Sequence, residues 1–295
     1  MLIKWSPSDW CRIFILSEKH TGRMATALCR EVVDAGSAKR YTKMMALNLS
    51  VLLQSNSLFR RGKAVFVKKG GISMKYEAAI FDLDGTLVDS LDDLADSANA
   101  ALHAHGFPEH EVAAYRYFVG DGSRKLIERI LPKKHAEDAG FVDAFMAEYK
   151  NFYAEHLLHK TKPYDGIMDM LEELRRRRIP MAICTNKHQN AAESIVEALF
   201  PHNIFHEIIG DQDGLPRKPD PQKVLYIMKK FGVTGANTAY FGDTNVDMDT
   251  ARNAKTFAVG VLWGFRPKEE LVAHGANVLL AHPMELFKKV TFAEQ

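Results

Sequence analysis

The strongest constraint on the fold of this chain is a short apolar segment that ends in two carboxylates. Residues 78–81 read Ala-Ala-Ile-Phe, and Asp82-Leu83-Asp84-Gly85-Thr86 follows directly. An apolar run with β-formers, stopped by a Gly-Thr turn, is typical of a buried strand. In an open α/β sheet, ligands bind at the carboxyl ends of the strands. Asp82 and Asp84 are therefore the first candidate site residues.

The spacing of these two acids favours a metal site. Because they are two positions apart, both side chains can lie on the same side of the strand end, with the backbone carbonyls between them also available. Carboxylates held close together repel one another unless a cation neutralises them. A few oxygen ligands with room left for water suit Mg²⁺. Taken alone, the pattern also fits a solvated acidic turn, so the choice between a turn and a metal site depends on motifs elsewhere in the chain.

Composition excludes several classes of protein. The chain has 295 residues, 46% of them hydrophobic, which suffices for one large or two ordinary domains. Beyond residue 73 it carries 26 basic and 33 acidic residues, which argues against binding to nucleic acid. Its 3 cysteines are too few and too scattered for a disulfide framework or a zinc site, so we expect a reducing, cytoplasmic setting. No apolar run approaches the ~18–20 residues of a membrane span, so we expect no membrane partner.

Residues 1–73 differ from the rest of the chain. They hold 13 Lys and Arg against 4 Asp and Glu, and no helical or strand period persists along them. A basic, acid-poor leader is compatible with an organellar transit peptide or with a disordered basic tail. We expect instead that the segment is an artefact of the start site and that Met74 is the native start, because Met74 stands immediately before the first predicted strand.

The stretch that follows the acidic motif predicts an inserted helical domain. Apolar residues recur at helical spacing after Ser90, and no β-rich run interrupts them before Lys160. Pro163 and Gly166 then break the period. We therefore expect an all-helical cap over residues 91–161, inserted into a core made of residues 74–90 and 162–295. The expected helices of the cap cover residues 91–105, 109–117, 123–131 and 137–158.

From residue 166 onward, helices and strands alternate regularly. This alternation predicts a doubly wound parallel sheet with helices on both faces and all strand carboxyl ends at one edge. The fold class is therefore α/β, with a Rossmann-like core and the inserted helical cap. The expected strands cover residues 179–185, 204–209, 238–241, 256–261 and 277–280, and the expected helices cover residues 168–178, 189–199, 221–231, 246–254 and 268–274.

Two of these strands are followed by residues that suit an anion. Thr185 and Asn186, with the backbone N–H groups of the next helix, would form a phosphate-binding nest, although the local sequence alone favours a plain helix cap. Lys218 lies in a segment stiffened by Pro219 and Pro221, where it would be a fixed cation or a surface turn residue. Cys184, inside the strand before Thr185, is expected to be a core residue.

A further strand supplies more carboxylates. Gly242-Asp243 follows residues 238–241, and Asp247 lies one helical turn later, with helix capping as the alternative role for Asp243. Gly242 permits close approach of the backbone. Taken together, the strand ends offer three or four carboxylates for a hard cation, a hydroxyl, an amide and a lysine. This combination suits phosphoryl transfer.

These residues resemble the motifs of the haloacid dehalogenase superfamily, from about Met74 to the end of the chain. Asp82–Thr86 matches the first motif, Thr185 the second and Lys218 the third, and Gly242-Asp243 with Asp247 matches the fourth. Residues 118–122, 218–221 and 263–267 are similar to the phosphoglycolate phosphatase branch.

The resemblance implies a phosphomonoester hydrolase. Asp82 would attack phosphorus to form an aspartyl-phosphate, and Asp84 would act first as a general acid and then as a general base. Dehalogenases of the superfamily lack an acid at the position of Asp84, so its presence favours phosphate esters. The implied Mg²⁺ ligands are Asp82, Asp84 through its backbone carbonyl, and Asp243, with Asp247 in support, and the implied phosphate-binding residues are Thr185, Asn186 and Lys218.

The substrate is expected to be a small phosphorylated metabolite, with 2-phosphoglycolate first. The loop Gly120, Asp121, Gly122 would close over the site, and Arg124 would bind a substrate carboxylate. The alternatives left open are a sugar phosphomutase, a pyrophosphatase or nucleotidase of the same superfamily, and a binding protein that has kept the fold without catalysis. The sequence leaves open whether the protein is a monomer or a homodimer.

Overall fold

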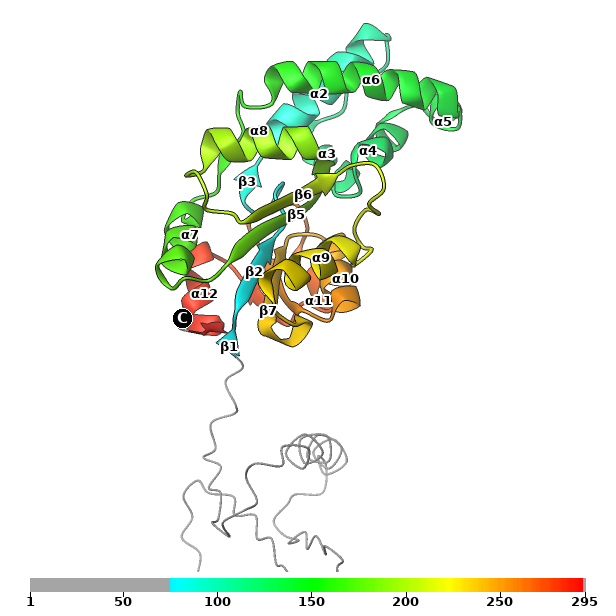
Figure 1. Cartoon of the computed structure of the whole chain (residues 1–295). Coiled ribbons are helices and arrows are strands. Elements are labelled where there is room, and N and C mark those ends of the chain that lie inside the picture. The colour runs from blue at the N-terminus through cyan, green and yellow to red at the C-terminus, as the bar shows by residue number, and fades with distance from the viewer. Residues whose placement is uncertain (1–74, 294–295) are drawn as a thin grey trace, which may run out of the picture. The chain divides into compact units, whose positions relative to one another are not determined.

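A six-stranded parallel sheet forms the centre of the structure (Figure 1). The computed structural model describes residues 75–293, so the interpretations of residues 1–73 and of Met74 lie outside it. The strands of the sheet are β2 (Ala78–Phe81), β5 (Met181–His188), β6 (Glu207–Asp211), β7 (Thr238–Gly242), β8 (Phe257–Val261) and β9 (Val278–Leu280). Their spatial order is β6-β5-β2-β7-β8-β9, which is the doubly wound order that reverses direction beside the first strand.

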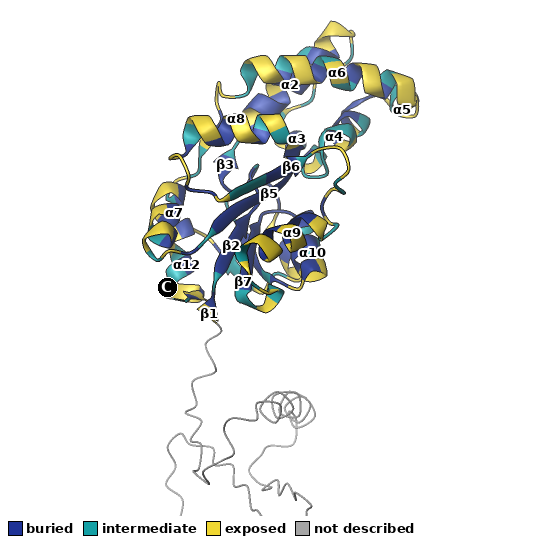
Figure 2. Ribbon diagram, in the orientation of Figure 1, coloured by how far each residue is buried: buried dark blue, intermediate teal, exposed yellow. Residues whose placement is uncertain are grey.

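Helices cover both faces of this sheet, as predicted. Because successive side chains of a strand point to opposite faces, Phe81 and Ile80 of β2 enter two different hydrophobic clusters. Phe81 packs with α7 (Ile167–Arg176), α8 (Gln189–Leu199) and α12 (Leu286–Lys289). Ile80 packs with α9 (Gln222–Phe231), α10 (Asn245–Ala254) and α11 (Lys268–Ala273). The strands are accordingly buried while the outer faces of the helices are exposed (Figure 2).

Two strand boundaries differ from the prediction. β5 continues through Thr185 to His188, because His188 still pairs with Asp211 after an irregularity in register. The strand expected at residues 204–209 begins only at Glu207. Ile204 and Phe205 are buried in a hydrophobic cluster outside the sheet, so their apolar character reflects packing and not strand pairing.

The chain from Leu91 to His156 is built of helices, as predicted. It contains α2 (Leu91–Ala104), α3 (Val112–Phe118), α4 (Ser123–Ile130), α5 (Lys133–Ala136) and α6 (Ala139–His156), which pack around their own hydrophobic cluster. The helix expected over residues 137–158 begins at Ala139, because Asp138 caps it by accepting a hydrogen bond from the Phe141 backbone N–H at 3.1 Å. The division into core and cap domains stays a prediction.

The two ends of this helical segment lie side by side. The short strands β3 (Val88–Asp89) and β4 (Lys162–Pro163) pair antiparallel. The buried Asp93 carboxylate accepts hydrogen bonds from the backbone N–H groups of Lys160 and Thr161, at 3.0 and 2.8 Å.

A second pair of short strands, β1 (Lys75–Tyr76) and β10 (Thr291–Phe292), is parallel and lies outside the central sheet. Within residues 75–293, no helix combines the length and the apolar character needed to cross a membrane.

Candidate active site

The predicted strand ends meet where the order of the sheet reverses. β2 and β7 are neighbours, and Asp82 and Asp243 directly follow them. The Asp82 backbone N–H donates to the Phe241 carbonyl at 2.9 Å, so the two strand ends are joined at Asp82 itself and two residues before Asp243. In doubly wound folds this reversal point is the crevice in which ligands bind.

Lys218 lies between two of the predicted carboxylates. Its ammonium nitrogen is 2.8 Å from Asp82 Oδ1 and 2.8 Å from Asp247 Oδ1. The side chain is only 1% exposed. Burial lowers the pKa of Lys218, but the Asp247 and Asp82 carboxylates raise it by more, so the pKa is raised and the group stays charged. Lys218 is thus a buried, fixed cation beside Asp82.

Hydrogen bonds hold both Asp247, in the first turn of α10, and Asp243, which precedes that helix. Asp247 forms a capping box with Thr244, accepting from both the backbone N–H and the hydroxyl of that residue. Asp243 accepts from the Thr86 hydroxyl at 3.1 Å and from the Phe265 backbone N–H at 2.8 Å. The capping role considered for Asp243 therefore belongs to Thr244 and Asp247.

Asp82, Asp243 and Asp247 form a cluster whose chemistry fits a hard divalent cation. One carboxylate oxygen of each lies within 4.8 Å of the others, and all three residues are buried. Burial raises the pKa of Asp82 to about 6, against the opposing effect of Lys218. Burial and the neighbouring carboxylates also raise the pKa of Asp243. A bound cation with oxygen preference, such as Mg²⁺, would relieve this repulsion.

Asp84 has a different set of partners, which the sequence analysis missed. Its carboxylate accepts from the Ser90 hydroxyl at 2.6 Å, and both of its oxygens lie within 3.1 Å of the Lys187 ammonium. Lys187 also donates to the Tyr153 hydroxyl at 2.5 Å, and burial raises the pKa of that phenol, so it stays neutral. The Asp84 side chain is outside the three-acid cluster, and metal binding by its backbone carbonyl stays a prediction.

The segment around Thr185 is positioned differently from the prediction. Thr185 and Asn186 lie in β5, and α8 begins only at Gln189, so no helix N-terminus opens at these two residues. The Asn186 amide donates to the Gly120 and Lys218 carbonyls and accepts from the Lys218 backbone N–H. Both of its donors are thereby used, so we replace the predicted phosphate-binding role of this side chain with one of holding the Lys218 segment in place.

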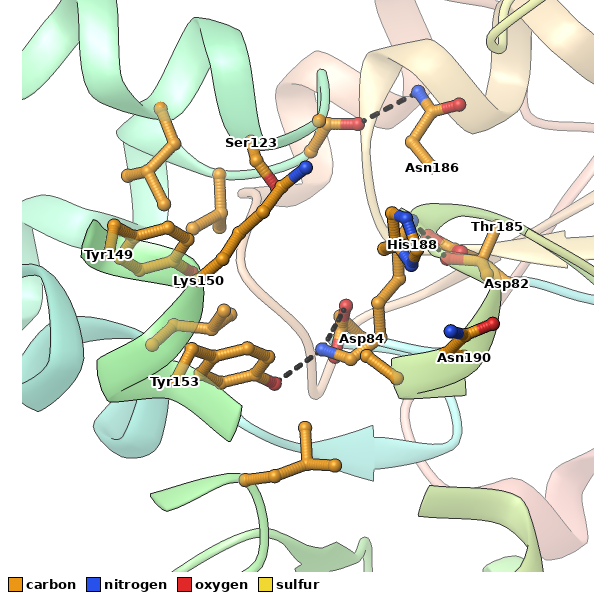
Figure 3. Close-up of a pocket in the computed structure, with 18 of the residues that line it drawn as sticks. Asp82, Asp84, Ser123, Tyr149, Lys150, Tyr153, Thr185, Asn186, His188 and Asn190 are labelled. Carbon is orange, nitrogen blue, oxygen red and sulfur yellow. Dashed lines mark hydrogen bonds and ion pairs between the residues drawn. The ribbon is translucent and has the colours of Figure 1, made fainter. Parts of the chain in front are cut away.

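A cavity of about 350 Å³ opens over these residues (Figure 3). Its floor includes Asp82, Asp84 and Thr185, with Asn190 of α8 on the same side, and its opposite wall comes from α4 and α6. Cys184 is buried and does not line the cavity, and burial raises the pKa of its thiol to about 11, in agreement with the predicted core role.

The predicted specificity loop lies only partly at this cavity. Gly120 and Gly122 line it. The Asp121 carboxylate instead pairs with Arg129 at 2.5 Å. Arg124 pairs with Asp143 of α6, so its guanidinium is neutralised outside the cavity. The prediction that Arg124 contacts the substrate is therefore not supported by its position, because α4 turns this side chain towards α6.

Gly264 is a further residue that the sequence analysis did not assign to the site. A Cβ atom at this position would lie 2.3 Å from the Asp243 Cβ and 2.3 Å from the Gly85 carbonyl oxygen. No heavy atom fits at such distances, and the nearest obstacle is backbone that cannot swing aside. Gly264 therefore permits the loop after β8 to pack directly against Asp243 and the first motif.

Gly264→Ala is expected to lower the free energy of unfolding by about 1–3 kcal/mol and to weaken Mg²⁺ binding at least about tenfold, because Asp243 must move. Thermal unfolding with and without Mg²⁺ measures both effects. Gly140→Ala is the matched control, because its Cβ would meet only Asp138 Oδ1, at 3.4 Å. If Mg²⁺ stabilised the Gly264→Ala variant as much as it stabilises the unchanged chain, the role given to Gly264 in positioning Asp243 would be wrong.

Comparison with known proteins gives one consistent family. A family model described as haloacid dehalogenase-like hydrolase matches residues 79–261. The chain is 35% identical to a phosphoglycolate phosphatase of Chromobacterium violaceum, over 72% of this chain and 95% of the relative. It is 29% identical to an N-acetylmuramic acid 6-phosphate phosphatase of Pseudomonas aeruginosa, over 72% and 94%. A hydrolase of known structure from Pseudomonas syringae superposes with a TM-score of 0.62 at 25% identity, covering 72% of this chain and 97% of that one.

Proposed function

The chain belongs to the haloacid dehalogenase-like hydrolase family, and from this premise we propose that it is a Mg²⁺-dependent phosphatase acting on a small phosphomonoester. The observation that carries the proposal is the contact between Asp82 and Lys218 at the reversal point of the sheet. There a buried carboxylate that lines the cavity contacts a buried cation, and two further acids lie close beside it. A carboxylate nucleophile beside a fixed positive charge suits attack on a phosphoryl group.

In the first proposed step, an Asp82 carboxylate oxygen attacks phosphorus and the ester bond to the leaving oxygen breaks. Asp84, which also lines the cavity, gives its proton to that oxygen. Ser90 and Lys187 hold the Asp84 carboxylate in position. The product of this step is an alcohol and an aspartyl-phosphate on Asp82.

In the second proposed step, water attacks the aspartyl-phosphate. Asp84, now ionised, takes a proton from that water, and Asp82 leaves as a carboxylate with release of inorganic phosphate. Lys218, which contacts Asp82, and the Thr185 hydroxyl, which lines the cavity, would stabilise the charge that spreads over the phosphoryl oxygens in both steps.

The three-acid cluster gives this chemistry its metal dependence. Asp82, Asp243 and Asp247 are the residues whose side chains would hold Mg²⁺. Such an ion neutralises the developing charge of a transferring phosphoryl group. The carboxylates themselves keep the site acidic and buried, which favours an oxygen-liganded cation over softer metals.

Two substrates follow from the relatives. 2-Phosphoglycolate is the first, because several relatives at 30–35% identity carry that activity in their names. N-Acetylmuramic acid 6-phosphate is the second, on the evidence of one relative and of a cavity of about 350 Å³, which has room for more than a two-carbon acid. Both molecules are phosphate monoesters that also carry a carboxylate.

A phosphate-release panel tests this proposal. We expect Mg²⁺-dependent hydrolysis of 2-phosphoglycolate or N-acetylmuramic acid 6-phosphate with a kcat/KM at least about tenfold above that for sugar phosphates, nucleoside monophosphates and pyrophosphate. Removal of divalent cations with EDTA should abolish turnover, and added Mg²⁺ should restore it. Exchange of phosphate among sugar phosphates without net release would point instead to a mutase, and no turnover of any ester would overturn the proposal.

A further inference from the structure

One lysine of α6 stands out on the cavity wall. Lys150, Tyr153 and Ala154 of α6 line the cavity at the spacing i, i+3 and i+4 of one helix face, and Leu157, which caps the helix, lines it one turn further on. The other three members of this face are aromatic or aliphatic. Figure 3 shows the Lys150 side chain extending from α6 into the cavity, on the side opposite the strand ends.

Lys150 differs from Lys187, Lys218 and Arg124 in having no anionic partner among the described residues. Lys187 is paired with Asp84, Lys218 lies between two carboxylates, and Arg124 pairs outside the cavity. Lys150 makes no ion pair or side-chain hydrogen bond with any of residues 75–293. It is exposed, so its ammonium stays hydrated until a ligand enters. The cavity therefore presents one uncompensated positive charge opposite the proposed nucleophile.

We propose that Lys150 binds the carboxylate of the substrate and makes the enzyme select phosphomonoesters that carry one. This inference rests on the proposed function, because it assumes that the phosphoryl group lies against Asp82 and Lys218. The remainder of the ester then extends towards α6, the wall on which Lys150 stands. One lysine matches the single charge of a carboxylate, whereas a second phosphate would leave excess negative charge unpaired. Lys150 thus takes the role that the sequence analysis had given to Arg124.

Replacement of Lys150 by Met, which keeps the length of the side chain and removes its charge, tests the inference in the full chain with Mg²⁺. The substrates are 2-phosphoglycolate and 2-hydroxyethyl phosphate, which has a hydroxymethyl group in place of the carboxylate. Loss of a charge-assisted hydrogen bond should raise KM for 2-phosphoglycolate about tenfold to a hundredfold with little change in kcat. Turnover of 2-hydroxyethyl phosphate should change less than about twofold, and Lys150→Arg should restore most of the preference.

Lys133→Met is the matched control, because the Lys133 side chain is 91% exposed on α5 and does not line the cavity. An equal loss on both substrates, or an unchanged preference in the Lys150→Met variant, would overturn the role of Lys150 and leave the phosphatase intact. Failure of the unchanged chain to hydrolyse either ester would instead overturn the proposed function, and this inference with it.

Discussion

Replacing Asp82 with Asn is expected to lower kcat by at least about 10⁴-fold, because the amide cannot form the aspartyl-phosphate and no neighbouring group stands in for it. Asp84 is held by Ser90 and Lys187, and Asp243 by Thr86 and the Phe265 backbone, so neither is free to take the place of the nucleophile. Phosphate release from the best substrate of the panel measures the effect. Asp213→Asn, an exposed acid outside the cavity, should retain full activity.

The stability of the same variant shows whether the loss is chemical. Burial raises the pKa of Asp82 to about 6, above its ordinary value of 3.8, so ionised Asp82 is a cost to the metal-free fold at pH 7. That cost is absent below pH ~4 and grows to about 3 kcal/mol as the pH rises through 6. Without metal, Asp82→Asn should therefore unfold at a temperature equal to or above that of the unchanged chain at pH 7, and this advantage should vanish near pH 4. A variant that is unfolded, or that keeps more than about 1% of activity, would count against Asp82 as the nucleophile.

The features of the fold that the sequence predicted correctly are those set by local pattern. Ile80 and Phe81 are adjacent apolar residues that enter opposite clusters, as a strand buried on both faces requires. The alternation of strands and helices after Gly166 then leaves few topologies, because parallel crossovers are right-handed and short. The meeting of Asp82, Lys218, Asp243 and Asp247 follows from that topology, since each comes after a strand that ends at the same edge.

The features that the sequence did not predict depend on contacts between distant segments. Tyr153 and Lys187 meet only because α6 lies across the end of β5. Arg124 was a reasonable candidate from its place after a glycine loop, but the partner that neutralises it, Asp143, is a matter of how α4 packs on α6. Gly264 is required by the closeness of Asp243, which no local pattern records. Ion-pair partners and steric limits of this kind depend on how the helices and loops pack in three dimensions, so they cannot be predicted from the sequence pattern.

Replacing Lys218 with Met is expected to lower the free energy of unfolding by about 3–5 kcal/mol and to lower kcat/KM at least about 10³-fold. The loss of stability follows from the buried position of the ammonium. Its removal leaves Asp82 and Asp247 facing each other in the interior with no compensating charge. The loss of activity follows from removal of the cation that, within residues 75–293, pairs with the proposed nucleophile. Chemical denaturation and phosphate release measure the two effects.

Lys223→Met separates the effect of this ion pair from that of burying a lysine. Lys223 is fully buried, and its ammonium donates at 3.0 Å to the Thr185 carbonyl, with no ion pair to any carboxylate of the described chain. Burial lowers the pKa of Lys223, whereas two carboxylates raise that of Lys218, so the two buried lysines differ chiefly in their anionic partners. Lys223→Met should therefore lower the free energy of unfolding by less than Lys218→Met does, with a difference of about 2 kcal/mol or more. Mg²⁺ should recover part of the stability lost in Lys218→Met, because it would bind the same carboxylates. Equal costs for the two variants, with no recovery by Mg²⁺, would mean that Lys218 serves the fold as a packed side chain and not as the charge that holds the acids together.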